Sequence, residues 1–218
     1  MNVLAACEES QRVCIEFRRM GHNAFSCDIM ECSGGHPEWH IQGDVLPLLD
    51  GRCTFTTMDG TEHRIEGKWD MLIAFPPCTY LSKAGGNRLR INGEIQKERY
   101  QKGTDAANFF RKFLTADCPK IVVENPIPLK IFQLPQYDQI IQPFMFGEPW
   151  QKTTCLWLRG VPPLFATEIV IPESKWVNST DHRKNPKKDK WQTAGKKSQK
   201  ERSKTFPGIA KAMAEQWG

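Results

Sequence analysis

The sequence has no apolar run long enough to cross a bilayer and no Cys-x-x-Cys pair among its eight cysteines. The first absence leads us to expect no membrane partner, and the second argues against a zinc ribbon or a dithiol redox motif. No signal-peptide pattern precedes the apolar segment that begins at Asn2. We therefore expect a cytoplasmic protein whose thiols are reduced.

A set of metal ligands is also missing. The best candidate set of ligands consists of Cys27, Cys32, His36 and His40. Their intervals of five, four and four residues match no common zinc-binding pattern. We predict no metal, and we interpret the two histidines as loop residues.

What is present is the composition of a globular α/β domain, with 39% hydrophobic and 25% charged residues in 218 positions. The chain suits one domain, 1–218, with a sizeable core. Its net charge of +5 is unevenly distributed. Eleven Lys or Arg and three acids between Lys175 and Lys204 give that stretch +8, so the remainder carries −3. A basic stretch of this kind, with Trp176 and Trp191 inside it, is typical of nucleic-acid binding and equally of a solvated tail.

The amino terminus predicts a strand-helix-strand unit, the beginning of a Rossmann-like half. Residues 2–6 form the first predicted strand, residues 10–21 the helix, and residues 23–28 the second strand. Ser10 is the expected N-cap and Gly21 the expected stop. In such a unit a carboxylate at the end of the second strand can accept hydrogen bonds from a ribose, which makes Asp28 a candidate, with a capping Asp as the alternative.

Two further predicted strands each end in polar or reactive side chains, and we expect these side chains to lie at the same edge of the sheet. The apolar segment 69–75 ends at Pro76-Pro77-Cys78, and the apolar segment 120–123 ends at Glu124-Asn125-Pro126. Prolines stop each strand because they cannot donate to a ladder. A buried, unreactive thiol is the alternative interpretation of Cys78.

The ordered pair Pro-Pro-Cys and Glu-Asn-Pro resembles the catalytic core of the cytosine-5 DNA methyltransferases. The sequence most resembles the short cytosine-methyltransferase-like proteins of phages and prophages. This resemblance implies a role in DNA methylation or restriction-modification, in the cytoplasm of a bacterium or of a phage-infected host. This resemblance implies a Rossmann-like class I methyltransferase fold, with a mainly parallel sheet and an antiparallel hairpin near the carboxyl end. We place the hairpin strands within 138–147 and 154–158.

The resemblance also implies catalytic roles. Cys78 would add to carbon 6 of cytosine, and Glu124 would hydrogen-bond the ring nitrogen and exocyclic amine. Asn125 would hold the turn or the exocyclic group. The target base would have to leave its stack, or be single-stranded, to reach the thiol.

S-adenosylmethionine is the implied cofactor. The first turn lacks the glycines of the family, so Glu8 or Glu9 would face the cationic end of the donor, with a helix-start acid as the alternative. Asp28 would bind the ribose, and Asp44 would contact the adenine. The expected donor site comprises Ala6, Cys7, Glu8, Glu9, Asp28, Ile29, Asp44, Val45, Phe75 and Pro76.

Five residues are expected to bind the substrate. A Gly-containing loop over 79–90 resembles the family's closing flap, and it carries cations. Near the late hairpin, two residues stand where the family has the arginines of a Gln-x-Arg-x-Arg motif. The set is Lys83, Arg88, Arg90, Lys152 and Thr154.

The remaining segments complete the expected domain. A hairpin insertion is predicted over 52–66 around Asp59-Gly60, a helix over 94–114, and a closing helix over 206–217 beside the first strand. The basic segment 172–204 stands where longer relatives insert a target-recognition domain. Because it is too short for a core of its own, we expect weak sequence selectivity, a short recognition site, or target recognition by a homodimer or a second subunit.

Three functions therefore stay open. The first is a DNA cytosine-5 methyltransferase, the second is an RNA cytosine methyltransferase with the same chemistry, and the third is a catalytically silent, methyltransferase-like module that binds nucleic acid.

Overall fold

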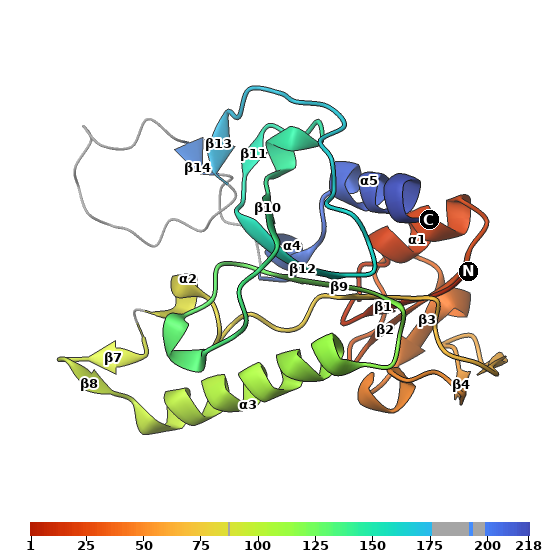
Figure 1. Cartoon of the computed structure of the whole chain (residues 1–218), viewed down its shortest axis with the longest axis horizontal. Helices are drawn as coiled ribbons and strands as arrows, with labels where there is room; N and C mark the ends of the chain where they lie inside the picture. Colours follow the sequence, from red (N-terminus) through yellow and green to blue (C-terminus); the bar gives the residue numbers. More distant parts are fainter. Residues whose placement is uncertain (87, 176–191, 194–198) are drawn as a thin grey trace.

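The computed structural model describes residues 1–86, 88–175, 192–193 and 199–218. Its centre is a mostly parallel seven-stranded sheet (Figure 1). In spatial order the strands are β10 (Gln139–Ile141), β12 (Thr154–Arg159), β9 (Lys120–Asn125), β6 (Met71–Ala74), β1 (Asn2–Ala6), β2 (Asn23–Asp28) and β3 (His40–Gln42). Only β12 runs against its neighbours, β9 and β10. The expected mainly parallel sheet with a late antiparallel hairpin is confirmed.

Helices cover both faces of this sheet (Figure 1). Alternate residues of β1 point to opposite sides. Val3 and Ala5 pack with helices α1 (Arg12–Arg19) and α5 (Pro207–Trp217), whereas Leu4 and Ala6 share a core with α3 (Lys97–Thr115). Buried side chains of α5, among them Met213 and Trp217, place the closing helix beside the first strand, as predicted.

Smaller elements surround the sheet. Strands β4 (Cys53–Thr56) and β5 (Glu62–Ile65) form a separate hairpin, as do β7 (Arg90–Ile91) and β8 (Glu94–Ile95). A third small sheet joins β11 (Trp150–Gln151), β13 (Ser174–Lys175) and β14 (Gln192–Thr193). Two short helices, α2 (Lys83–Gly86) and α4 (Gln199–Ser203), complete the described elements, apart from 3-10 turns at Pro37–Trp39, Leu46–Leu48, Lys130–Phe132 and Pro143–Met145.

Some sequence expectations need correction. Ser10 is not the N-cap of α1, which begins after Gln11, and that residue has a left-handed φ of 58°. The hairpin turn at Asp59-Gly60 is not a two-residue turn, because residues 57–61 separate β4 from β5 and Thr57 N donates to Thr61 O at 3.0 Å. This insertion also joins the core, since Phe55 and Ile65 are buried in it.

Two other differences concern strands and helix starts. The predicted helix over 94–114 begins only at Lys97, because Glu94 and Ile95 pair with β7 as a strand. Glu124 and Asn125 lie inside β9 and do not follow it, because the antiparallel partner β12 extends the ladder to both residues. Most of the basic segment, including Trp176 and Trp191, lies outside the described residues.

Candidate active site

The loop after β6 presents Cys78 at the carboxyl edge of the sheet. Phe75 N donates to Ala6 O at 2.9 Å, which keeps the loop aligned with β1. Pro76 is buried, and Cys78 is half-buried. The amides of Leu81 and Ser82 both donate to Cys78 O, at 3.1 and 3.0 Å. The turn after the two prolines is therefore closed by backbone hydrogen bonds, which hold the cysteine in a defined position.

Asn125 connects this turn to the end of β9. Its Nδ2 donates to Pro76 O at 2.8 Å, and its side chain is fully buried. The chain beyond each strand end continues the connection, because Lys83 N donates to Ile127 O at 3.0 Å and Leu129 N donates to Leu81 O at 2.7 Å. The expected role of Asn125 in holding a turn thus has a structural basis: it fixes the cysteine loop to its neighbouring strand.

Glu124 lies on the opposite face of β9 from Asn125 and shares an environment with Thr154 and Lys152. Its register partner is Leu156 in β12, so Thr154, two residues earlier, is on the same face. Burial raises the pKa of Glu124, while the charge of Lys152 and a hydrogen bond from the Thr154 side chain partly offset the rise. Both residues at the expected arginine positions therefore act on this carboxyl.

Cys78 belongs to the same cluster. Burial is the main cause that raises the pKa of its thiol, and the charge of Glu124 adds to the rise. Lys152 and Arg202 lower it, but not enough to reverse the direction. Nearby positive charge favours the reactive thiolate, but here burial and the carboxyl outweigh the two cations.

The first loop, residues 7–11, forms the second part of the site. Cys7 and Gln11 both adopt left-handed backbone conformations, with φ of 59° and 58°. Such conformations are uncommon for residues other than glycine and are enriched at functional sites. The loop thus turns tightly without the glycines that the family has in this position.

Glu8 bonds the start of helix α1, which was the alternative to its expected contact with the methyl donor. Its two carboxylate oxygens accept hydrogen bonds from Val13 N at 2.7 Å and Cys14 N at 3.2 Å. Burial raises its pKa to about 7, although these two hydrogen bonds act in the opposite direction. Because both oxygens are engaged by α1, contact between Glu8 and a donor stays a prediction.

Glu9 is the acid that remains available. It is only 5% exposed, and both of its side-chain oxygens are buried without a hydrogen bond among the described residues. Lys200 of α4 provides its counter-charge at 3.4 Å. A buried carboxylate with unfilled acceptor capacity fits the cationic end of a ligand.

The expected ribose and adenine residues lie at the ends of the next strands. Asp28 ends β2, is half-buried, and accepts a hydrogen bond from Met30 N at 2.9 Å. Burial raises its pKa, and that hydrogen bond opposes the rise. Asp44 is exposed and caps the next turn through Leu46 N at 3.0 Å. Ile29, the residue after Asp28, is an apolar side chain that is 77% exposed.

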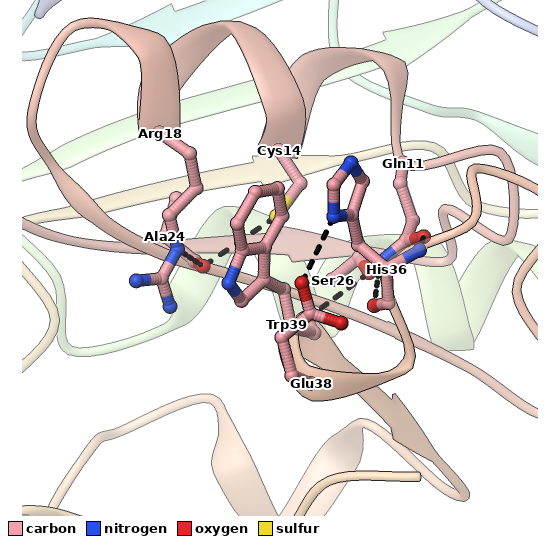
Figure 2. Close-up of polar contacts among 8 residues, drawn as sticks. All are labelled: Gln11, Cys14, Arg18, Ala24, Ser26, His36, Glu38 and Trp39. Atoms are coloured by element: carbon pink, nitrogen blue, oxygen red, sulfur yellow. Dashed lines mark hydrogen bonds and ion pairs between the residues drawn. The ribbon is translucent and has the colours of Figure 1, made fainter. Parts of the chain in front are cut away.

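A polar cluster behind the first loop fixes its shape (Figure 2). Gln11 Nε2 donates to His36 O at 2.8 Å, and His36 N donates to Gln11 Oε1 at 3.1 Å. His36 stacks on Trp39 with ring centroids 3.9 Å apart, and Arg18 lies beside the same indole. Gly34 is required here, because a Cβ at that position would meet Gln11 Cβ at 2.6 Å. The first loop has no glycine of its own, and Gly34 in the facing loop allows the two loops to approach closely.

Of the expected flap residues, Lys83 lies in α2, Arg88 follows that helix, and Arg90 begins β7. Lys83 begins α2 and is near Cys155, whose thiol pKa its charge lowers against the larger effect of burial. Arg88 and Arg90 are exposed, and Arg90 donates to Gly93 O at 3.0 Å within the β7–β8 hairpin. That hairpin projects from the body of the protein beside α2 (Figure 1). Contact of these cations with a substrate stays a prediction.

His40, one of the two histidines expected in a loop, lies instead in strand β3 of the central sheet. His40 is fully buried in β3, where Nδ1 is 2.8 Å from Ser26 Oγ and Nε2 is 2.9 Å from Met30 O. Burial lowers its pKa. In the described part of the chain, no group of three or more His, Cys, Asp or Glu side chains is arranged to hold a metal ion.

Sequence reasoning does not find three residues of this region: Gln11, Lys200 and Arg202. Gln11 carries no pattern that marks a left-handed loop residue. In the sequence, Lys200 and Arg202 are only members of a basic stretch, whereas in the structure Lys200 pairs with Glu9 of the first loop and the charge of Arg202 lowers the pKa of the Cys78 thiol. The Gly34-Gly35 pair is the one local signal of a close approach.

No family model matches the chain, and no curated protein matches it. None of the helices in the described ranges is both long and apolar enough to cross a membrane.

Proposed function

We propose that the protein is an S-adenosylmethionine-dependent methyltransferase that acts on carbon 5 of cytosine in DNA. The proposal depends above all on one observation: the loop that carries Cys78 and the end of the neighbouring strand that carries Glu124 lie together at the carboxyl edge of the sheet, joined by the hydrogen bond from Asn125 Nδ2 to Pro76 O. This edge is where open α/β sheets bind ligands. The mainly parallel sheet with its late antiparallel hairpin is compatible with a class I methyltransferase fold.

The pair suits nucleophilic catalysis on a pyrimidine. Carbon 5 of cytosine is a weak nucleophile, and addition of the Cys78 sulfur to carbon 6 makes the ring an enamine-like nucleophile. Glu124, whose pKa burial raises, would in its protonated form donate to the ring nitrogen and stabilise the charge that appears during attack. Once carbon 5 carries the new methyl group, its proton passes to solvent water, the electron pair of that carbon–hydrogen bond re-forms the carbon 5–carbon 6 double bond, and the sulfur–carbon bond breaks to release the thiolate.

The residues of the first loop and the next strand ends fit the methyl donor. Glu9, which is paired with Lys200 at 3.4 Å, offers a buried carboxylate to a cation, Asp28 offers oxygen acceptors to a ribose, and Ile29 offers an apolar surface to a purine. S-adenosylmethionine, when bound, supplies an electrophilic methyl group. The chain's own contribution is to orient that group toward the base held by Cys78 and Glu124.

Trapping with a mechanism-based substrate tests this proposal. An oligonucleotide with 5-fluorocytosine at its target cannot lose the atom on carbon 5, so the adduct with Cys78 should persist and appear as a denaturant-resistant complex when the donor is present. A pool of oligonucleotides with fluorinated cytosine in varied contexts removes the need to know the target sequence. Cys78→Ser should abolish the complex, and Cys53→Ser, a half-buried thiol on the β4–β5 hairpin, should leave it unchanged.

The catalytically silent binding module is the second candidate. Two observations favour it: the raised pKa of Cys78 keeps the thiol in its unreactive form, and Glu9 is already paired with Lys200. Calorimetry with S-adenosylmethionine separates the two. Heat of binding that disappears in Glu9→Gln and Asp28→Asn supports the enzyme, and absence of heat with the folded wild type supports the module. Repeating the trapping with fluorinated RNA decides between the two polynucleotides.

A further inference from the structure

Helix α4 is fixed against the candidate site at both of its ends. Lys200 Nζ, in its first turn, is 3.4 Å from Glu9 Oε2 in the first loop. Just beyond its last turn, Arg12 Nη1 donates to Thr205 O at 2.6 Å. The short basic helix is thus held between the first loop and the start of α5, and the residues between these two attachments are brought close to the site.

Arg202 lies between these two attachments. It is half-buried, and its Nε is buried with no hydrogen-bond partner in the part of the chain that the structure describes. Its charge acts on the thiol of Cys78, after that of Lys152. A buried guanidinium donor left unpaired costs free energy that a ligand acceptor would restore.

The local sequence explains why an arginine is needed there. Lys152 and Thr154 stand where arginines were expected, and both are occupied with Glu124. Lys152 Nζ also lies 5.9 Å from the ring centroid of Phe206, just after α4. Lysine offers a point charge, whereas recognition of a carbonyl or phosphate oxygen with fixed geometry favours the planar fork of a guanidinium.

We propose that Arg202 binds the target nucleotide beside Cys78 through an oxygen acceptor, and so provides from α4 the arginine that the β11–β12 turn lacks. The inference rests on the proposed function, since it assumes that a nucleotide is bound at Cys78. It makes α4 part of the substrate site and assigns a role to a residue of the basic segment.

The test compares three variants in the fluorocytosine trapping assay. Arg202→Gln should slow adduct formation by about 10- to 100-fold, the loss expected for one charge-assisted hydrogen bond. Arg202→Lys should recover part of the rate, because it restores charge without the fork. Lys211→Gln removes an exposed cation on α5 and should trap at the wild-type rate. Donor binding by calorimetry should be the same in all four proteins.

The outcomes separate this inference from the proposed function. If the wild type traps and Arg202→Gln traps equally fast, Arg202 does not bind the nucleotide. If the wild type does not trap at all, the proposed function fails and this inference fails with it. Binding to an oligonucleotide with an abasic target distinguishes the two acceptors: an affinity loss in Arg202→Gln that persists there indicates a phosphate oxygen, and one that disappears indicates a base carbonyl.

Discussion

Cys78 and Glu124 cannot both ionise easily, because each is desolvated and each disfavours a second negative charge nearby. The pKa of both groups is raised above its ordinary value, with burial as the first cause in each. A carboxyl ordinarily ionises at a lower pH than a thiol, so a thiolate beside a protonated carboxyl is not the resting state of the pair. Attack on a pyrimidine requires that state, with the thiolate as nucleophile and the carboxyl as hydrogen-bond donor, so substrate binding has to favour it.

Glu124→Gln is expected to change thiol reactivity and methyl transfer in opposite directions. Without the negative charge the pKa of Cys78 falls, so alkylation of Cys78 by iodoacetamide should reach its half-maximal rate at a lower pH than in the wild type. Methyl transfer should fall by about 10²- to 10⁴-fold, because a neutral amide is a poor acid. Peptide mass mapping across a pH series measures the first effect, and transfer of labelled methyl measures the second. An unchanged alkylation profile would show that the two side chains are not electrostatically coupled.

At the scale of elements, α1 begins without a side-chain N-cap of the usual kind. Glu8, in the preceding loop, replaces it and bonds two of the amides that a helix start leaves unsatisfied. The arrangement buries a carboxylate at the positive end of the helix dipole, where desolvation still outweighs the favourable field. Stability and the shape of the first loop are therefore linked at Glu8.

Glu8 should make stability depend on pH. Its pKa of about 7 lies above the ordinary value of 4.5 that applies when the chain is unfolded, so the folded state holds the proton more tightly. The stabilisation is present below about pH 4.5 and is lost as the pH rises to about 7. Glu8→Gln should remove roughly 2 kcal/mol of the wild-type difference in unfolding free energy between about pH 5 and about pH 7.5. Urea denaturation at both pH values measures it, and an identical difference in the two proteins would contradict the assignment.

Regular elements were predictable from the sequence where one periodicity dominates. The bounds of β1 and β2 follow from short apolar runs between turn residues, and α5 follows from its apolar spacing. The start of α1 was not predictable from the sequence. Ser10 is a residue type that often caps helices, whereas no local sequence rule indicates that Glu8 bonds the first amides of the helix. Residues 83–86 and 90–91 were expected as a loop, whereas 83–86 form the short helix α2, directly after a backbone pairing of 81–83 with 127–129, and 90–91 pair with β8.

The candidate site was predictable to the extent that strand ends define it. Because parallel strands end at one edge, the order of the strands in the sequence indicates that Cys78, Glu124 and Asn125 meet there. The antiparallel return of β12 brings Thr154 to the same edge. Arg202 could not be placed, since its position depends on the ion pair of Lys200 with Glu9 and on the Arg12–Thr205 hydrogen bond, and neither leaves a periodic signal.

At the scale of the whole molecule, positive charge is concentrated in one segment while the remainder of the chain is slightly acidic. Between Lys175 and Lys204 the net charge is +8, against +5 for the entire chain. The part of this segment that forms α4 lies against the candidate site through Lys200 and Arg202. A polyanion bound at Cys78 would therefore approach the most basic stretch of the protein.

This asymmetry predicts that DNA binding weakens with salt, and that the segment is responsible. Replacing Lys187, Lys188 and Lys190 with Gln should lower the slope of log affinity against log salt by up to about 0.9 for each phosphate that is no longer neutralised. The matched control replaces the exposed cations Lys97, Lys102 and Lys112 of α3 with Gln and should keep the wild-type slope. Fluorescence anisotropy with a duplex oligonucleotide over a salt series measures all three proteins. Equal slopes in the two triple variants would show that phosphate binding does not depend on this segment, because an equal charge was removed from each.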